Sequence, residues 1–256
     1  MRRRAMASGC LLLLLAACSP ASDDATDSRR ASESSPSTTA PATPTPTATP
    51  EPEPTPEASE IREVPREQWD AMVDAGMVRQ ECPIQRRDQL RRVDLNFVDF
   101  DGELQRGALV VHRDTAESVQ RIFDRIFELE FPIAMMVGVE EFDGDVADSL
   151  SANNTSAYNC RRADQINAPF QDSPHANGRA VDINPVQNPW MDLRCDCWTP
   201  SAEFADRTPG PGKILGKDDV WQVFDDEGWV WQNISVPDYM HFDTGYPSTP
   251  YEAPTS

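Results

Sequence analysis

The stretch QDSPHANGRAVDINP contains His175, one of only three histidines in the chain, and a carboxylate in an unusual setting, Asp182. Asp182 lies between Val181 and Ile183, two residue types that are usually buried. In an extended strand, Val181 and Ile183 face one side and Asp182 faces the other. A half-buried carboxylate needs a cation or strong hydrogen-bond donors. His175, in the loop just upstream, is therefore a candidate to ligate a metal together with Asp182.

The stretch PDYMHFD supplies a third candidate ligand, His241, and a further carboxylate, Asp238. Two histidines and one carboxylate, with a fourth position left open, are what a catalytic zinc ion needs. Zinc lowers the pKa of its bound water to about 7, and Asp238 is then the candidate general base. Because residues three apart face opposite sides of a regular strand, a turn must separate Asp238 from His241, and Pro237 favours one. On spacing alone, these residues are equally consistent with ordinary surface or hydrogen-bonded side chains.

The N-terminus predicts export. The basic start MRRR and the apolar run LLLLLAA fit a secretory signal over residues 1–17, and this run is too short to cross a bilayer of about 30 Å. The small residues that end in Cys18 resemble a bacterial lipobox, which predicts a lipidated Cys18 and a membrane-anchored lipoprotein. An ordinary cleaved signal with an incidental cysteine is the alternative. Residues 18–60 are rich in Ser, Thr, Pro and Glu and predict a disordered linker, which leaves 61–256 for one globular domain.

Charge and cysteine content narrow the class of protein further. The formal net charge of −20 disfavours nucleic acid or an anionic lipid surface as a partner. After Cys18, four cysteines remain, and an even number in an exported chain suggests disulfides with three possible connectivities. The closely spaced Cys195 and Cys197 also fit a metal site, but one C-x-C pair is a weak signal.

Hydrophobic periodicity predicts both helices and strands. The predicted helices cover 66–77, 115–130 and 217–228, and the predicted strands cover 91–100, 107–112, 131–139, 179–184, 229–234 and 240–243, with 140–172 irregular apart from a short segment at 158–161. Strands and helices mix without a regular βαβ rhythm, which favours an α+β domain over a parallel α/β one.

Three segments carry a resemblance to a known family. SPHANGRAVDINP matches the signature S-x-H-x-x-G-x-A-x-D-[IL]-N-P, PDYMHF matches D/E-x-x-H-F, and NTSAYNCR matches N-T-S-x-[FY]-N-C-R. From Cys82 to Phe242, the chain thereby resembles the D-alanyl-D-alanine carboxypeptidase and L-alanyl-D-glutamate endopeptidase family. These zinc metallopeptidases cut bacterial cell-wall peptides and include the vancomycin-resistance carboxypeptidases. The resemblance implies a small antiparallel sheet with flanking helices and a zinc site in a cleft, as in D,D-peptidases and Hedgehog domains.

The resemblance also implies a role for each matched residue. His175, Asp182 and His241 would ligate Zn²⁺, and Asp238 would act as the base. Arg161 would polarise the scissile carbonyl and stabilise the oxyanion, a role that suits a fixed guanidinium. The carboxypeptidase members usually carry Glu as the base, so Asp238 is closer to the endopeptidase-like members.

Other matched positions concern the substrate and the disulfides. Ser173 matches the signature serine, which either hydrogen-bonds the substrate or caps its own loop. Cys82 and Cys160 fall on cysteine positions of the exported branch of the family, which implies that they pair. Cys195 and Cys197 lie outside the family pattern, and are then left to each other in a tight ring or to free or intermolecular roles.

Together these features predict a monomeric zinc peptidase that hydrolyses peptidoglycan stem peptides, anchored to the membrane through Cys18 and facing the cell wall. Two bonds are candidates for cleavage, the terminal D-Ala-D-Ala bond and the internal L-Ala–D-Glu bond. The alternative is a non-catalytic, zinc-containing cell-wall binding module of the same fold, and a purely structural zinc is a third reading. Retention of Asp238 and Arg161 favours catalysis, and structural zinc sites normally close the fourth position with Cys or His.

Overall fold

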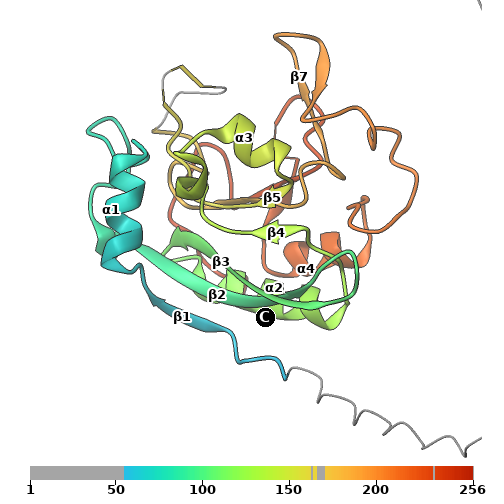
Figure 1. Cartoon of the computed structure of the whole chain (residues 1–256), viewed down its shortest axis with the longest axis horizontal. Coiled ribbons are helices and arrows are strands. Elements are labelled where there is room, and N and C mark those ends of the chain that lie inside the picture. The colour runs from blue at the N-terminus through green and yellow to red at the C-terminus, as the bar shows by residue number, and fades with distance from the viewer. Residues whose placement is uncertain (1–54, 163, 166–170, 233, 256) are drawn as a thin grey trace, which may run out of the picture. The chain divides into compact units, whose positions relative to one another are not determined.

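The computed structural model describes residues 55–162, 164–165, 171–232 and 234–255 (Figure 1). The predicted signal peptide, Cys18 and most of the predicted linker lie outside the described residues, so those predictions stay predictions. Within the described ranges, no helix has the length and apolar character that a membrane span requires.

The first sheet has three antiparallel strands. Their order is β1 (Glu60–Glu63), β2 (Leu90–Val98) and β3 (Leu104–His112). The long β2–β3 hairpin turns at Gly102, whose φ of +81° is one that favours glycine. Val93, Leu95 and Phe97 alternate into the core as predicted, where they pack against helix α2, Ala116–Glu128 (Figure 1).

The second sheet positions the polar residues of interest. Its three short strands are antiparallel, in the order β6 (Ala180–Asp182), β10 (His241–Asp243) and β9 (Val230–Trp231). Phe242 is fully buried, and its ring stacks on Phe224 of helix α4, Asp219–Asp226, with the ring centroids 3.8 Å apart. Because side chains alternate along a strand, His241 and Asp243 project away from the face that Phe242 buries.

Shorter elements surround the two sheets. They are α1 (Arg66–Asp74), α3 (Val146–Ser151), the 3-10 turns η1 (Arg87–Gln89) and η2 (Val139–Phe142), the parallel pair β4 (Met135–Met136) and β5 (Asn154–Thr155), and the antiparallel hairpin β7 (Trp190–Asp192) and β8 (Cys197–Thr199). This mixture of helices with small, mostly antiparallel sheets confirms the α+β class.

An ion-pair network fastens the start of β6 to the end of β3. Arg179 donates from Nη2 to Asp114 at 2.6 Å, and Nδ1 of His112 lies 2.6 Å from the same carboxylate. The backbone N–H of Tyr251 donates to Asp114 at 3.1 Å and ties in the C-terminal segment. Burial alone would raise the pKa of Asp114, but hydrogen bonds from His112 and Arg179 outweigh it and hold this pKa well below its usual value.

The structure corrects several boundaries. The helix predicted over 66–77 ends at Asp74, because Gly76 adopts a φ of +69° that stops a helix. The strand predicted over 131–139 shrinks to Met135–Met136, since an apolar run alone does not distinguish a strand from other buried chain. Residues 140–172 are less irregular than predicted: Asp145 caps α3 by accepting from two backbone N–H groups. The sequence patterns also do not predict β1, β7 or β8.

Candidate metal centre and active site

Strand pairing brings two of the predicted metal ligands together. In the β6–β10 ladder, His241 lies directly opposite Asp182, and Phe242 lies opposite Val181. Directly opposed residues of an antiparallel pair point to the same face. The ladder therefore sends Val181 and Phe242 into the core and presents Asp182 and His241 side by side on the other face. The alternation in the sequence predicts the face of Asp182, but not this pairing.

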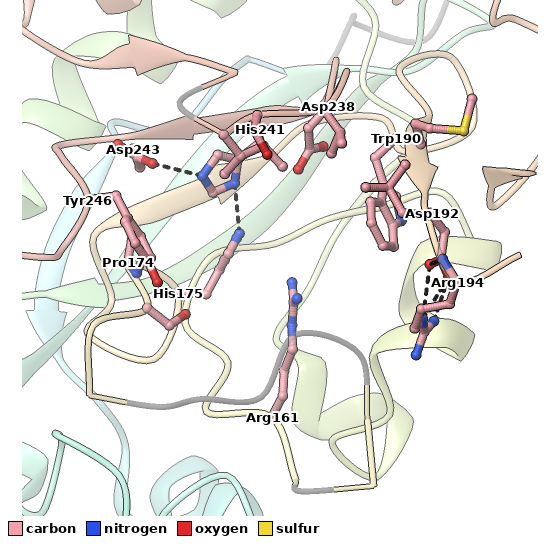
Figure 2. Close-up of a pocket in the computed structure, with 16 residues that line it drawn as sticks. Arg161, Pro174, His175, Trp190, Asp192, Arg194, Asp238, His241, Asp243 and Tyr246 are labelled. Atoms are coloured by element: carbon pink, nitrogen blue, oxygen red, sulfur yellow. Dashed lines mark hydrogen bonds and ion pairs between the residues drawn. The ribbon is translucent and has the colours of Figure 1, made fainter. Parts of the chain in front are cut away.

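The third predicted ligand closes a compact triangle. Nε2 of His175 lies 3.1 Å from Nδ1 of His241 and 3.2 Å from Oδ1 of Asp182, and the His241–Asp182 distance is 3.1 Å. All three residues are buried, and Figure 2 shows the two imidazoles facing each other. Each of them offers one ligand atom, and these atoms lie within 4.8 Å of one another, so this group could hold a metal ion.

Hydrogen bonds on the outer side of each ring fix its orientation. Nδ1 of His175 lies 2.7 Å from the carbonyl oxygen of Ala157, which can only accept, so Nδ1 carries the proton. Nε2 of His241 lies 3.0 Å from Oδ2 of Asp243, so this nitrogen donates in the same way. In their neutral forms, both rings then turn an unprotonated nitrogen toward Oδ1 of Asp182. Three lone pairs converge on one point, an arrangement that favours a cation.

The triangle is close to the size that zinc requires. Zinc binds nitrogen and oxygen at about 2.0–2.2 Å, so the ligand atoms of a tetrahedral site lie about 3.3–3.6 Å apart. The three observed separations, 3.1 to 3.2 Å, are slightly below this range. The residue types and their spacing therefore fit a zinc ion held by three protein ligands.

The electrostatics of the site agree with its geometry. Burial lowers the pKa of His241, but hydrogen bonds to Asp182 and Asp243 outweigh it and raise this pKa to about 10. Burial raises the pKa of Asp182, but the charges and hydrogen bonds of His175 and His241 hold it well below its usual value. The site thus favours a positive charge at this point, which a proton or a metal cation can supply.

Asp238 lies beside the triangle, directly before the turn that its spacing from His241 demands. Residues 239–240 form that turn, and the backbone N–H of His241 donates to the carbonyl oxygen of Asp238 at 3.3 Å. The Oδ1 atom of Asp238 is buried and has no hydrogen-bond partner among the described residues. Burial raises the pKa of Asp238 to about 7, helped by the charge of Asp182 and opposed by that of His241. Such a carboxylate is suited to exchange a proton near neutral pH.

Arg161 extends into the same pocket from the side opposite Asp238 (Figure 2). Its backbone is held next to the Cys82–Cys160 disulfide, and Arg79 donates to the carbonyl oxygens of Cys160 at 3.1 Å and of Arg161 at 2.8 Å. Burial lowers the pKa of Arg161, while the charges of nearby carboxylates act against this. A half-buried arginine whose backbone is anchored in this way is a suitable donor to developing negative charge.

The pocket lined by Arg161, His175, Asp238 and His241 has a volume of about 380 Å³. Ser173 lines it, and its Oγ also accepts from the backbone N–H of Ala176 at 3.3 Å, which is the contact that a loop cap makes. Other lining residues are not predicted as site residues by the sequence patterns, among them Trp190, Asp192, Arg194, Asp243 and Tyr246. Asp243 follows His241 by two residues in a strand, so period-two alternation could have placed it on the same face.

An α+β fold that presents two histidines and a carboxylate in a pocket, beside another carboxylate and an arginine, has the composition of a metallohydrolase site. Residues 167–244 match the family model described as D-alanyl-D-alanine carboxypeptidase. The match covers less than a third of the chain and includes His175, Asp182, Asp238 and His241, so this part of the chain is similar to that peptidase family. No curated protein and no solved structure matches the chain.

Proposed function

We propose that this protein is a zinc-dependent peptidase that hydrolyses peptide bonds in peptidoglycan stem peptides. The observation that carries the proposal is the convergence of three ligand atoms, 3.1 to 3.2 Å apart, on a point beside the buried Oδ1 of Asp238. The match of residues 167–244 to a D-alanyl-D-alanine carboxypeptidase model supports the substrate class.

The side chains of the site have separate roles in the proposed hydrolysis. His175, Asp182 and His241 would hold Zn²⁺, which when bound supplies a Lewis acid and a water of lowered pKa. Asp238 takes a proton from the attacking water and returns it to the leaving amine as the peptide bond breaks. Arg161, on the other side of the pocket, donates to the carbonyl oxygen as negative charge develops there. No covalent enzyme intermediate is needed, since water is the nucleophile.

Export and lipidation belong to the same proposal. A lipid on Cys18 and a Pro-rich linker would hold the domain at the membrane, facing the cell wall that supplies its substrate. Recovery of the full-length protein in the soluble fraction of its host would contradict this part.

Asp238→Asn tests the mechanism. We expect the variant to bind Zn²⁺ like the wild type, because Asp238 is not one of the three ligands, and to lose about 10²- to 10⁴-fold in hydrolysis. Metal content by mass spectrometry and digestion of purified muropeptides measure the two properties. Asp238→Glu keeps a carboxylate and should retain part of the activity, and Asp101→Asn, in the exposed β2–β3 turn, is the control for a remote charge change.

The products identify the bond. Loss of one C-terminal alanine indicates a carboxypeptidase, whereas release of a peptide that begins with D-Glu indicates cleavage between L-Ala and D-Glu. Full activity in Asp238→Asn would remove Asp238 from the mechanism. A wild-type protein that binds zinc and muropeptides but cleaves neither bond would instead be a binding module.

A further inference from the structure

The β7–β8 hairpin carries a sequence feature that the proposed chemistry does not use, Arg194-Cys195-Asp196-Cys197. Cys195 and Cys197 form a disulfide that closes the turn between the two strands. Arg194 directly precedes this ring and lines the same pocket as His175 and His241, two of the proposed metal ligands. Figure 2 shows it paired with Asp192, on the side of the view opposite Tyr246.

Arg194 is held by one buried carboxylate. Its Nε donates to Oδ1 and Oδ2 of Asp192 at 2.9 and 3.1 Å, and its Nη2 donates to Oδ2 at 2.5 Å. The backbone N–H of Arg194 donates to the same carboxylate at 2.9 Å. The side chain of Asp192 is 6% exposed, whereas that of Arg194 is 60% exposed. The ion pair and the closed turn therefore restrain a guanidinium that remains accessible.

The free edge of that guanidinium can bind a second anion. Arginine offers five N–H donors in a planar fork. Asp192 occupies the Nε side, and Nη1 makes no hydrogen bond to any residue that the structure describes. The outer edge, formed by Nη1 and Nη2, matches the spacing of a carboxylate.

The charges of the pocket explain why an anionic substrate needs such a group. Asp238 and Asp243 also line the pocket and would repel a carboxylate that enters it. Arg161 is assigned to the carbonyl oxygen. Of the lining residues, Arg194 is the remaining cation whose charge does not depend on pH.

We propose that Arg194 binds a carboxylate of the substrate peptide, on the residue whose amine leaves, and so selects peptides that are acidic at this position. This inference rests on the proposed function. Both candidate bonds have such a group, because a terminal D-Ala bears the chain-end carboxylate and an internal D-Glu keeps the one carboxylate that does not continue the peptide. A free terminal carboxylate and a glutamate carboxylate offer the same chemistry, and the two arms of the experiment separate them.

The test compares free acids with amides. Two peptide pairs are used, one ending in D-Ala-D-Ala as acid or C-terminal amide and one containing L-Ala-D-Glu with its carboxylates free or amidated. Each peptide is N-methylated at the scissile nitrogen to block cleavage, and calorimetry measures its binding to the wild type, Arg194→Gln and Arg194→Lys. Arg121→Gln is the matched control: Arg121 makes a two-bond pair with Glu227, both bonds at 2.8 Å, and is 49% exposed, but it lies on α2 and does not line the pocket.

For one of the two pairs, the wild type and Arg121→Gln should bind the acid about tenfold or more tightly than the amide, as expected for one charge-assisted contact. Arg194→Gln should bind acid and amide alike, and Arg194→Lys should keep part of the preference. The pair that shows the Arg194-dependent preference identifies the carboxylate.

An equal affinity of the wild type for acid and amide in both pairs overturns the inference, as does an unchanged preference in Arg194→Gln. Because this measurement requires no turnover, it is separate from the proposed function. An Arg194-dependent preference without hydrolysis of the unmethylated peptides would support the inference and reject the peptidase. Hydrolysis of the unmethylated peptides without an Arg194-dependent preference would support the peptidase and reject the inference.

Discussion

Asp243 provides a sharp test of the metal centre, because it contacts a proposed ligand without being one. It is fully buried, and its Oδ2 lies 3.0 Å from Nε2 of His241. Its Oδ1 accepts from the backbone N–H of Gly245 at 2.7 Å. We expect Asp243→Asn to weaken zinc binding while leaving the three ligands in place.

The magnitude follows from what an amide can do in this position. A carboxylate accepts from both N–H groups at once, whereas an asparagine presents one oxygen and one NH₂ group. If the NH₂ group faces His241, it donates to Nε2 and stabilises the tautomer whose Nδ1 carries a proton, at the point where the metal must bind. If the oxygen faces His241, the NH₂ group opposes the N–H of Gly245. Either arrangement should lower zinc affinity by about 10- to 100-fold, or about 1.4–2.7 kcal/mol.

Competition with a chromophoric zinc chelator at constant pH measures this affinity without reference to catalysis. Asp238→Asn is the control, since it removes a neighbouring carboxylate that contacts neither ring nitrogen in the structure. The melting temperature in excess zinc gives a second readout, because a ligand stabilises the folded state in proportion to the logarithm of its concentration over Kd. An Asp243→Asn affinity within twofold of the wild type would refute the role of Asp243 in orienting His241.

Two further predictions concern stability. Replacing Cys82 and Cys160 by Ala should lower the free energy of unfolding by about 4 kcal/mol, because the disulfide closes a loop with a sequence separation of 78. The same replacement should reduce kcat, since Cys160 anchors Arg161. Denaturant titration measures the first effect and muropeptide assays the second, and an unchanged kcat would argue against the anchoring. The depressed pKa of Asp114 makes its stabilising contribution complete above its unfolded pKa of about 3.9 and progressively lost as pH falls below it. Wild-type stability should therefore fall more steeply between about pH 5 and 2 than that of Asp114→Asn, and parallel denaturation curves across this range would contradict the assignment.

The sequence predicts the core of the site because its residues belong to short strands with clear alternation. Val181 and Ile183 flank Asp182, and burial of the flanking pair leaves Asp182 a single face to occupy. His241 joins it through strand pairing, whose register the alternation alone does not specify. The turn after Asp238 is likewise deduced from spacing, since no regular strand could place it beside His241.

The pocket wall is much harder to predict. Strand β7 lies outside every segment that hydrophobic periodicity predicts as a strand. The pairing of Arg194 with Asp192 depends on a turn closed by Cys195 and Cys197, whose partners the sequence leaves open. The strand at 131–139 is instead predicted too long, because buried segments are apolar whether or not they pair with another strand.

The hairpin that carries Arg194 also holds the proposed base. Trp190 forms a bridge with Asp238, and the backbone N–H of Met191 donates to the carbonyl oxygen of Pro237 at 2.8 Å. On the other strand of the hairpin, the ring of Trp198 stacks on Tyr239, with centroids 5.4 Å apart. A shift of the hairpin must therefore move the segment that bears Asp238.

Under the proposed function, this contact between β7 and the segment of Asp238 couples substrate binding to catalysis. A substrate carboxylate bound by Arg194 would restrain β7, and β7 restrains the backbone of Asp238 through the bridge at Trp190. Because general-base catalysis depends on the placement of the base to within about 1 Å, binding at Arg194 would favour the position in which Asp238 accepts its proton. A peptide that lacks the carboxylate would then lose turnover as well as affinity. Such coupling is the means by which binding energy remote from the reacting bond contributes to kcat.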